Sequence, residues 1–559
     1  MKKFKLILLI TIFILSLSTA FACGGDLPEE SDTPTPPTGP AITLVEGTKG
    51  LTYEITTTKK GVSYAVCTGY GTATDEDIVI ASHYNDLLVK EVKANAFKNN
   101  TVIKSVTFVN GMEKLNMYAF QGCTSLFSIT LSETLDNIGH NVFFQCENLL
   151  NICNNSPLEI KMGSSSLGYV GNYACNIYSA TSGGAGEFVT EGDFEYFTFP
   201  NNKFAMEYNG NETNMTIPSG VTGLYKDLFK DNAQLKSVFI PSSVTIIGKM
   251  AFANCTALES VTVEDNSKLA TVNESAFVGC EALTTYDYQS DLDSYLKITY
   301  AGDTSNPSYY SKSLRIDGEH IFDVYITDGL KTVSPHAFTN VATVRKILIP
   351  TSLEEIGAGA FAYCTNLKQF WFKDIDKSNL KIIWNSAFDN CSSIEELSFP
   401  KSLEIIEVAA FNECKSLLTL EFANNNNLKE IRQRAFWYCE KLQSTFLGHN
   451  SKCEYIGEEA FRYCKKMTTF NMGNNSIMKT LARLSLSECR ILKELYIPST
   501  CTVLGDYVFS GCFDGWPRDQ ATYCKIYADF PLKPTTWHSN FNSSNCPVYY
   551  NTPYPTFPE

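Results

Sequence analysis

The sequence predicts a repeat solenoid, which is a coil of stacked, similar units rich in β-structure. Three observations predict it. A segment of the type Ala-Phe-x-x-Cys recurs along the chain, for example at 360–364 and 435–439. Within uninterrupted runs its copies are spaced by 23, 25 or 27 residues, and all length variation falls at one point of the period. Fixed periods of this size are typical of solenoids, in which each unit packs only against its neighbours.

Each unit can be numbered from its central residue, position 0. Large apolar residues stand at −8 and −5, a small or apolar residue usually at −1, and Cys at +3 in eleven of the fourteen units. Apolar residues recur at +6, +9 and +11. The central residues are Phe97, Phe120, Phe143, Phe229, Phe252, Phe277, Phe338, Phe361, Phe388, Phe411, Phe436, Phe461, Leu486 and Phe509.

Each part of the unit predicts one element. The alternating +9/+11 pair predicts a short strand with one buried face. The −1/0/+3 set is closer to a short helical or 3₁₀ turn. The variable segment between +11 and the next −8 holds Pro-Ser-Ser (241–243) or an Asn-rich run (423–427), both of which favour turns. The insertions therefore belong on an exposed edge of the coil.

The recurring Cys is predicted to be a packed thiol. It occupies the same inward template as Leu and Phe, and small thiols are among the most buried side chains. Cys453 and Cys501 stand at −8, another core position. No Cys-x₂-Cys pair exists for zinc. Disulfides between adjacent coils are not excluded by distance, and a Cys524–Cys546 pair stays open. A Ser replacement at +3 is expected to cost roughly 1–3 kcal/mol, and an Ala replacement less.

Bulk composition limits the partners. The chain has 559 residues, 44% of them hydrophobic, which is enough for a large core. Its net charge of −15, without a basic stripe, argues against nucleic acid.

The N-terminus predicts export. A basic start (1–5) and an apolar stretch (6–17) form a signal peptide too short for a stable membrane span. Cys23 follows small residues and precedes Gly24, as in a bacterial lipobox, although Ala20 replaces the usual Leu. An acidic, Pro-rich tether (26–40) comes next. We expect a lipid anchor at Cys23, with membrane contact through that anchor; the alternative is a secreted protein.

Units such as Ile-Pro-Thr-Ser-Leu-Glu-Glu-Ile-Gly-Ala-Gly-Ala-Phe-Ala-Tyr-Cys-Thr-Asn-Leu (349–367) resemble the BspA-like leucine-rich repeats of bacterial and protist surface proteins. The resemblance covers most of 45–550 and implies a leucine-rich-repeat coil, horseshoe-like and β-rich with short helical or 3₁₀ turns. Three interruptions resemble the family's entry module (51–92), in-line hairpin (295–321) and terminal cap (527–550, with Trp537 and Cys546).

The predicted organisation follows from the repeat and its interruptions. In the segment 151–216, Asn209-Gly210 is expected to form a hairpin turn. The predicted parts are a signal peptide (1–22), a tether (23–44), an entry module (45–95), repeats (96–150), an irregular in-line insert (151–216), repeats (217–285), a hairpin insert (286–322), repeats (323–515), and a cap and tail (516–559).

The sequence offers little chemistry. None of the six His lies in a metal-binding spacing, and no nucleophile elbow, P-loop or dinucleotide fingerprint opens a helix. The acidic pairs at 291/293 and 374/376 lack the Gly and closing Glu of a calcium loop. We therefore expect no metal, no cofactor and no enzyme. The alternative is an active site formed by 147–216 or 286–322.

The coil instead offers a surface. Positions +8 and +10 flank the buried pair and point outward. Large apolar groups at sites expected to be wet mark interaction patches; the alternative is that they cover each other or lie under the inserts. A second cluster at +1/+2 (Tyr363, Trp437, Tyr438, Tyr463) is more consistent with shielding of the turn. The candidate ligand-binding residues at +10 are Phe239, Leu348, Trp371, Glu421, Phe446 and Tyr496.

These features predict a non-catalytic recognition protein, exported to the cell surface or outer envelope and monomeric. The resemblance implies adhesion to host or extracellular proteins, cells or glycans. The alternative function is a structural spacer or envelope component without a specific ligand.

Overall fold

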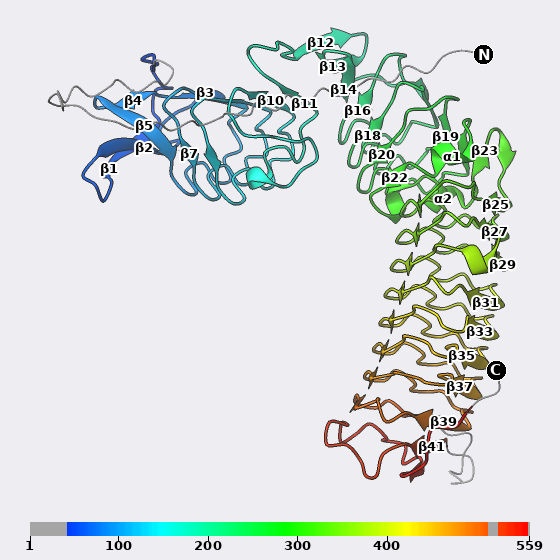
Figure 1. Cartoon of the computed structure of the whole chain (residues 1–559). Helices are drawn as coiled ribbons and strands as arrows, with labels where there is room; N and C mark the ends of the chain where they lie inside the picture. The colour runs from blue at the N-terminus through cyan, green and yellow to red at the C-terminus, as the bar shows by residue number, and fades with distance from the viewer. Residues whose placement is uncertain (1–41, 513–523, 557–559) are drawn as a thin grey trace, which may run out of the picture. The chain divides into compact units, whose positions relative to one another are not determined.

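The computed structural model describes residues 42–512 and 524–556. The predicted signal peptide, Cys23 and nearly all of the tether lie outside the described residues. The chain divides into two compact units, Met1–Ala180 and Thr181–Glu559 (Figure 1). Each unit has its own hydrophobic core. The division falls inside the segment 151–216.

The first unit begins with an antiparallel pair, β1 and β2, and continues as a parallel coil. Two strands in the segment predicted to be an irregular insert, β10 and β11, extend the second of its sheets in parallel. β10 is the +8 to +11 strand of the unit centred on Phe143, so only β11 carries the coil beyond the template, and the 3₁₀ turn η1 (Leu167–Tyr169) lies between these strands. The first sheet contains β1 (Thr52–Thr57), β2 (Ser63–Gly69), β4 (His83–Tyr84), β5 (Leu87–Val92), β7 (Lys114–Leu115) and β9 (Asn137–Ile138). The second contains β3 (Asp77–Ile80), β6 (Ser105–Phe108), β8 (Ser128–Leu131), β10 (Asn151–Asn154) and β11 (Asn176–Tyr178).

The second unit opens with antiparallel strands. The β13–β14 hairpin turns at Pro200-Asn201, and Asn201 has a φ of 62°. Pro followed by a residue with positive φ is the signature of a type II turn. The hairpin predicted at Asn209-Gly210 is wrong, because that dipeptide leads from β14 to β15, which belongs to a different sheet. One sheet contains β12 (Glu187–Glu191), β13 (Phe194–Phe199), β14 (Asn202–Tyr208), β16 (Gly223–Leu224), β18 (Ile246–Ile247), β20 (Thr271–Val272) and β22 (Thr299–Tyr300). The other contains β15 (Asn214–Thr216), β17 (Ser237–Ile240), β19 (Ser260–Val263), β21 (Thr285–Tyr288), β23 (Arg315–Ile316) and β24 (Glu319–His320).

The segment 286–322 contains the expected hairpin, since β23 and β24 pair antiparallel. It also holds two one-turn helices, α1 (Leu292–Tyr295) and α2 (Ser308–Ser311), and the 3₁₀ turn η2 (Asp303–Ser305). The segment is bound to the coil that follows it. His336 Nδ1 lies 2.6 Å from Asp303 Oδ1, and this contact lowers the pKa of Asp303.

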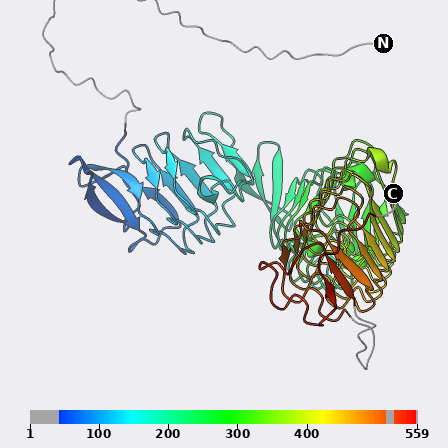
Figure 2. The same cartoon turned by 60° about the horizontal axis from the view of Figure 1, so that its bottom comes forward.

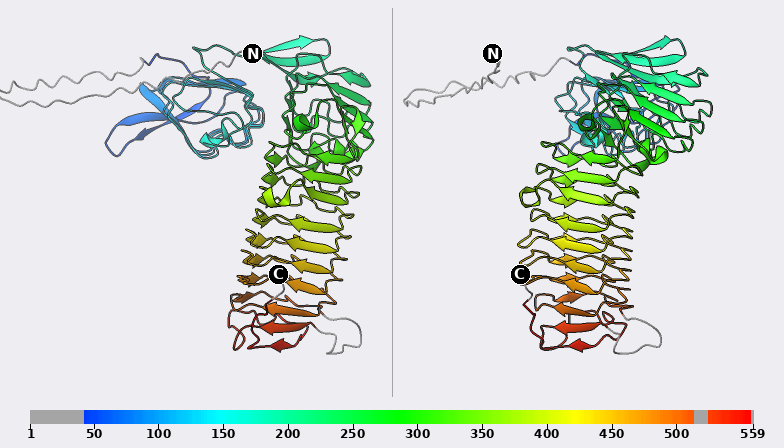
Figure 3. Two further views of the ribbon diagram at one scale, coloured as in Figure 1. Left: turned by 45° about the vertical axis from the view of Figure 1, so that its right-hand side comes forward. Right: turned by 90° about the vertical axis from the view of Figure 1, so that its right-hand side faces the viewer.

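The long run of coils after this insert has two parallel ladders on opposite sides (Figure 3). Figure 2 views the run more nearly along its stack. Strands at +8 to +11 form the long-strand ladder, which is interrupted between β29 and β31. The 3₁₀ turn η3 (Ile375–Lys377) lies in the connection there. The strands of the long-strand ladder are β25 (Asp323–Tyr325), β27 (Lys346–Ile349), β29 (Gln369–Phe372), β31 (Glu396–Phe399), β33 (Thr419–Phe422), β35 (Ser444–Phe446), β37 (Thr469–Asn471), β39 (Glu494–Ile497), β41 (Lys525–Ala528) and β42 (Val548–Tyr549).

The opposite side of the run carries the short-strand ladder, formed by two-residue strands mostly at −6 and −5. Its strands are β26 (Thr332–Val333), β28 (Glu355–Ile356), β30 (Ile382–Ile383), β32 (Ile405–Ile406), β34 (Glu430–Ile431), β36 (Tyr455–Ile456), β38 (Thr480–Leu481) and β40 (Val503–Leu504).

The Ala-Phe segment connects the two ladders as a chain of tight turns rather than as a helix. In all fourteen units the residues at −2 and +2 have positive φ, between 52° and 78°. These left-handed residues prevent a helix from propagating. They also turn alternate N–H groups toward the following coil. Phe361 N donates to Ala387 O at 2.8 Å, and Tyr363 N donates to Asp389 O at 2.7 Å.

The last coil of each run receives acceptors from a segment outside the repeat. Phe277 N donates to Thr304 O of the hairpin insert at 3.0 Å. Phe509 N donates to Phe541 O of the C-terminal segment at 3.1 Å. In the first unit, Phe143 N donates to Gly168 O at 2.8 Å. These segments therefore act as caps that satisfy backbone donors.

Two side-chain ladders fill the core. Within each run, consecutive Phe rings at position 0 stack with centroids 4.7–5.6 Å apart and planes within 13° of parallel. The prediction that the +3 Cys is a core residue is confirmed, because all eleven are buried. Each thiol also lies 3.0–3.5 Å from the carbonyl oxygen of position 0 in the preceding coil, to which it donates.

One exposed corner of the coil carries a ladder of Asn side chains. Asn450 Nδ2 donates to Asn425 Oδ1 at 2.9 Å, and Asn475 Nδ2 donates to Asn450 Oδ1 at 2.7 Å. All three residues have positive φ, between 52° and 54°. The Asn-rich segments are therefore turns, as predicted, and their amides also join successive coils.

Candidate binding surface

The long-strand ladder presents every second side chain to solvent. In β27 and β31 the residues at +9 and +11 are buried, whereas those at +8 and +10 are partly or fully exposed. This alternation confirms the predicted orientation of the strand. Backbone pairing then sets the neighbours on the outer face, because parallel strands in register place equal positions side by side.

The six predicted site residues differ in exposure. Trp371 is 48% exposed, Glu421 is also exposed, and Phe239, Leu348, Phe446 and Tyr496 are half-buried. The register places Leu348 beside Trp371, and Glu421 beside Phe446. The structure does not bring the six together, because they lie on three sheets: one holds Phe239, the β25–β27–β29 sheet holds Leu348 and Trp371, and the sheet that begins at β31 holds the other three.

Neighbouring rings account for part of the burial. The Tyr496 ring stacks on Tyr527 with centroids 4.7 Å apart, and Tyr527 stacks on Tyr549 at 5.2 Å. The Phe446 ring meets His449 edge-on at 5.1 Å. At these positions the apolar groups cover one another, as in the alternative that the sequence left open, and do not form a free interaction patch.

Sequence reasoning missed two exposed rings. Tyr325 is 49% exposed and stands beside Leu348 on β25, and Phe322 is 42% exposed just before that strand. Tyr325 precedes the first Ala-Phe segment of its run, so it falls outside the fourteen +10 positions. A signal was present, because Tyr325 lies one 23-residue period before Leu348.

The second predicted aromatic cluster contains half-buried rings covered by cations. The Tyr438 and Tyr463 rings lie 4.9 Å apart, and Trp437 lies 4.6 Å from Tyr438. The Lys465 ammonium lies 4.9 Å from the Tyr438 ring, and the Arg462 guanidinium 4.7 Å from the Tyr463 ring. This arrangement fits the expected shielding of the turn better than a free surface.

The buried thiols have the environment of unreactive groups. The eighteen Cys residues at 67–546 are unpaired, Cys524 and Cys546 included. Burial raises the pKa of the thiols along the long run, for example those of Cys364, Cys414 and Cys464, which disfavours the nucleophilic thiolate. Across 42–512 and 524–556, no group of three or more His, Cys, Asp or Glu side chains is arranged to hold a metal ion. Over the same ranges, no helix has both the length and the apolar character needed to cross a membrane.

The comparisons with known proteins agree with the repeat. The family described as BspA type leucine rich repeat region matches in six copies, at residues 82–179, 184–305, 317–391 and 381–514, which is more than half of the chain. A comparison with curated proteins finds no match.

Solved structures also match. A leucine rich cell surface protein from Faecalibacterium prausnitzii is 20% identical, with 65% of this chain and 94% of that chain covered and a TM-score of 0.38. A leucine-rich repeat protein from Bacteroides ovatus is 19% identical, with 64% and 88% covered and a TM-score of 0.38. A leucine-rich repeat protein from Eubacterium ventriosum is 14% identical, with 83% and 97% covered and a TM-score of 0.32.

Proposed function

Because the chain belongs to the family with the BspA type leucine rich repeat region, we propose that it is a non-catalytic recognition protein displayed at the cell surface. It binds extracellular proteins, cells or glycans, as a monomer, through the outer face of its long-strand ladder. Cys23 carries the lipid anchor, and the acidic, Pro-rich segment after it holds the coil away from the membrane.

One observation carries this proposal. The inward positions repeat the same residue types from coil to coil, whereas the outward positions on the same strands do not. Tyr325, Leu348 and Trp371 follow one another on three adjacent strands, and two of these three are about half exposed. Exposed aromatic groups on a rigid, preformed surface are typical of binding sites.

The binding proposal is tested with the purified chain from residue 24 onward. We expect it to bind at least one member of a panel of extracellular-matrix proteins, whole cells and glycans, and an outer-face variant such as Trp371→Ala to weaken that binding. Self-association or coating of cells without binding to any panel member would favour the structural spacer. Turnover of a substrate would contradict the proposal.

The anchor is tested separately by mass spectrometry of protein extracted from membranes. We expect a diacylglyceryl group on an N-terminal Cys23. Recovery of the chain from the medium with a free Cys23 thiol would show that the protein is secreted instead.

A further inference from the structure

We propose that the outer face of β25, β27 and β29 binds a neutral glycan chain that lies across the three strands. The inference rests on the proposed function, because it names the ligand class of a recognition surface. The site consists of two rows of outward side chains. The apolar row is Tyr325, Leu348 and Trp371, and the polar row is Asp323, Lys346 and Gln369.

Strand register sets the geometry of both rows. Each row holds one residue from each strand, directly paired with the next. Neighbouring strands lie about 4.8 Å apart, so Tyr325 and Trp371 arise from backbones about 10 Å apart. The two rows are separated by two residues along each strand, or about 7 Å. An elongated ligand that crosses the strands can therefore touch both rows along its length.

The polar row contacts the two exposed rings, and unlike the half-buried rings at +1/+2, Trp371 and Tyr325 stay 48% and 49% exposed beside their polar neighbours. The Lys346 ammonium lies 4.5 Å from the centroid of the Trp371 ring and 5.8 Å from that of Tyr325. The Tyr325 hydroxyl donates to Asp323 Oδ2 at 3.0 Å. Within 42–512 and 524–556, Lys346 makes no salt bridge. The surface is therefore preorganised, which lowers the entropic cost of binding.

The chemistry of the rows fits a sugar. A pyranose ring presents C–H groups on its faces, which pack on aromatic rings, and hydroxyls at its edge, which both donate and accept. The polar row supplies a carboxylate that accepts, an ammonium that donates and an amide that does both. The charges of Asp323 and Lys346 cancel. A polyanion would meet Asp323, and a polycation would meet Lys346, so a neutral ligand suits the row best.

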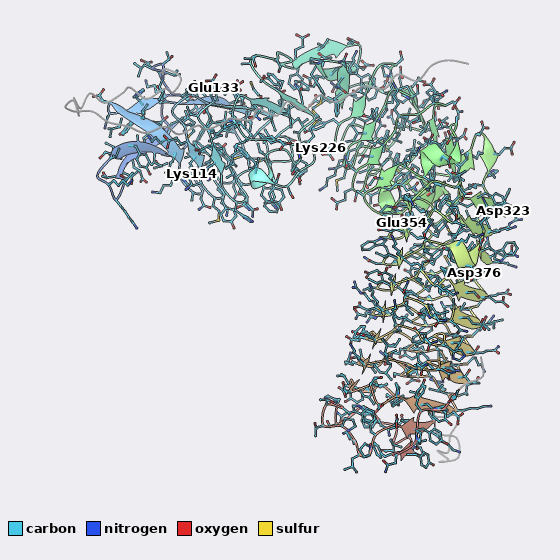
Figure 4. The ribbon with its side chains drawn as sticks, viewed as in Figure 1. Lys114, Glu133, Lys226, Asp323, Glu354 and Asp376 are labelled. Carbon is cyan, nitrogen blue, oxygen red and sulfur yellow. The ribbon has the colours of Figure 1, made fainter. Side chains whose placement is uncertain are left out.

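A hollow adjoins the polar row at Asp323. Its volume is about 370 Å³, and it is lined by Ile316, Glu319, His320, Ile321, Phe322 and Asp323. Its lining residues belong to the β23–β24 hairpin of the insert and to the start of β25, and Figure 4 labels Asp323 on that side of the coil. Figure 4 also shows Glu354 on the opposite side, close to the short-strand ladder. The hollow extends the site beyond the three strands and can receive one end of the glycan.

A peptide suits this face less well. Peptides that bind to sheets commonly add as a strand and use backbone hydrogen bonds at an open edge. β27, at the centre of the site, is paired on both sides. At the centre of the site, a ligand can therefore contact side chains but cannot pair with the backbone of β27.

The experiment measures dissociation constants by isothermal titration calorimetry with the chain from residue 24 onward. The probes are neutral hexasaccharides of β-1,4-glucan, α-mannan and β-galactan, heparin as a polyanion, and the matrix-protein panel. We expect binding to a neutral hexasaccharide, and a loss of about tenfold or more for Trp371→Ala and for Tyr325→Ala. Trp371→Phe should retain more affinity than Trp371→Ala. Trp384→Ala is the matched control, because Trp384 is 36% exposed and follows β30 of the short-strand ladder.

Each of the other outcomes contradicts a different part of the inference. Binding of a matrix protein or heparin, without any neutral hexasaccharide, would overturn the glycan inference and leave the proposed function intact. Hexasaccharide binding that Trp384→Ala weakens as much as Trp371→Ala would overturn the site. Absence of binding to every probe would overturn the proposed function as well. Circular dichroism and thermal unfolding confirm that each variant is folded.

Discussion

At the scale of single residues, the +3 Cys serves both as a packing group and as a hydrogen-bond donor. The three units without it have Asn100, Asn232 or Val341 at +3, and each is the first unit of its run. A first unit has no preceding Phe carbonyl to accept from a thiol. The structure thus explains why the Cys is absent at these three units, whereas the sequence alone indicated only a buried position.

This second role reverses the expected order of substitutions at +3. Cys391 donates to Phe361 O at 3.1 Å, and a Ser hydroxyl can make the same hydrogen bond. We now expect Cys391→Ser to cost about 1 kcal/mol and Cys391→Ala about 1–3 kcal/mol, since Ala leaves a cavity and removes the donor. Urea unfolding of the two variants measures the difference.

Cys453 provides the matched control. It is also buried, at position −8, but its thiol donates only a long hydrogen bond, 3.8 Å, to Tyr455 O of its own coil. There Ser should cost more than Ala, because burial of a hydroxyl is poorly compensated. The same order of Ser and Ala at both sites would contradict a donor role for the +3 thiol.

The thiols also predict the response to alkaline pH. Burial raises the pKa of the Cys391 and Cys439 thiols above the value of about 8.5 in an unfolded chain. Above that value the unfolded chain loses thiol protons that the folded chain keeps. The contribution of these thiols to the free energy of unfolding should therefore be constant below about pH 8 and fall as the pH rises further, by up to about 1.4 kcal/mol per pH unit for each thiol.

Urea titrations between pH 7 and pH 10 under reducing conditions test this dependence. Cys391→Ala should make the slope shallower by the contribution of one thiol. Met467→Ala, another buried residue in the run, should lower stability without changing the slope. A slope that Cys391→Ala leaves unaltered would mean that this thiol ionises equally in both states.

At the scale of elements, the sequence predicts those parts of the fold in which every second residue is buried. The long strands and their outward positions follow from apolar residues at +9 and +11, as in Ile347 and Ile349. The tight turns around position 0 could not be predicted from the sequence, because residues as different as Met250, Arg434 and Tyr463 adopt positive φ there. Hydrogen bonds between coils impose this left-handed backbone conformation, so the conformational preference of each residue type does not predict it.

The Asn ladder gives a prediction at this scale. Asn450 is held by hydrogen bonds to Asn425 and from Asn475, and its φ is 52°. Asn450→Ala should lower the free energy of unfolding by about 1–2 kcal/mol, because Ala is strained in the left-handed region and makes neither bond. Asn450→Gly relieves the strain and should recover part of the loss. Chemical denaturation that gives equal stability for the two variants would show that backbone conformation is unimportant here.

At the scale of the whole molecule, the two compact units have separate cores. Stability in a coil is close to a sum over neighbouring repeats, so damage in one unit should not reach the other. We expect calorimetry to show two unfolding transitions. Phe120→Ala and Phe411→Ala should each lower the free energy of unfolding of one unit by about 3–5 kcal/mol, and each should shift a different transition. A single transition shifted by both variants would contradict independent units.

The donors of the Ala-Phe segment give the stack a direction. In this segment each coil offers N–H groups to the coil that follows, and Phe509 N is satisfied by the C-terminal segment, whereas N–H groups beside the strands donate to the preceding coil, as Gly357 N does to Val333 O at 2.9 Å. Along the Ala-Phe side of the coil, the front of a stack therefore ends in carbonyl oxygens and the back ends in N–H groups. Buried N–H groups without partners are rarer in proteins than under-satisfied carbonyls. Loss of the rear segment would leave such N–H groups without partners on this side of the coil, so in evolution, gain or loss of coils should leave the rear segment in place.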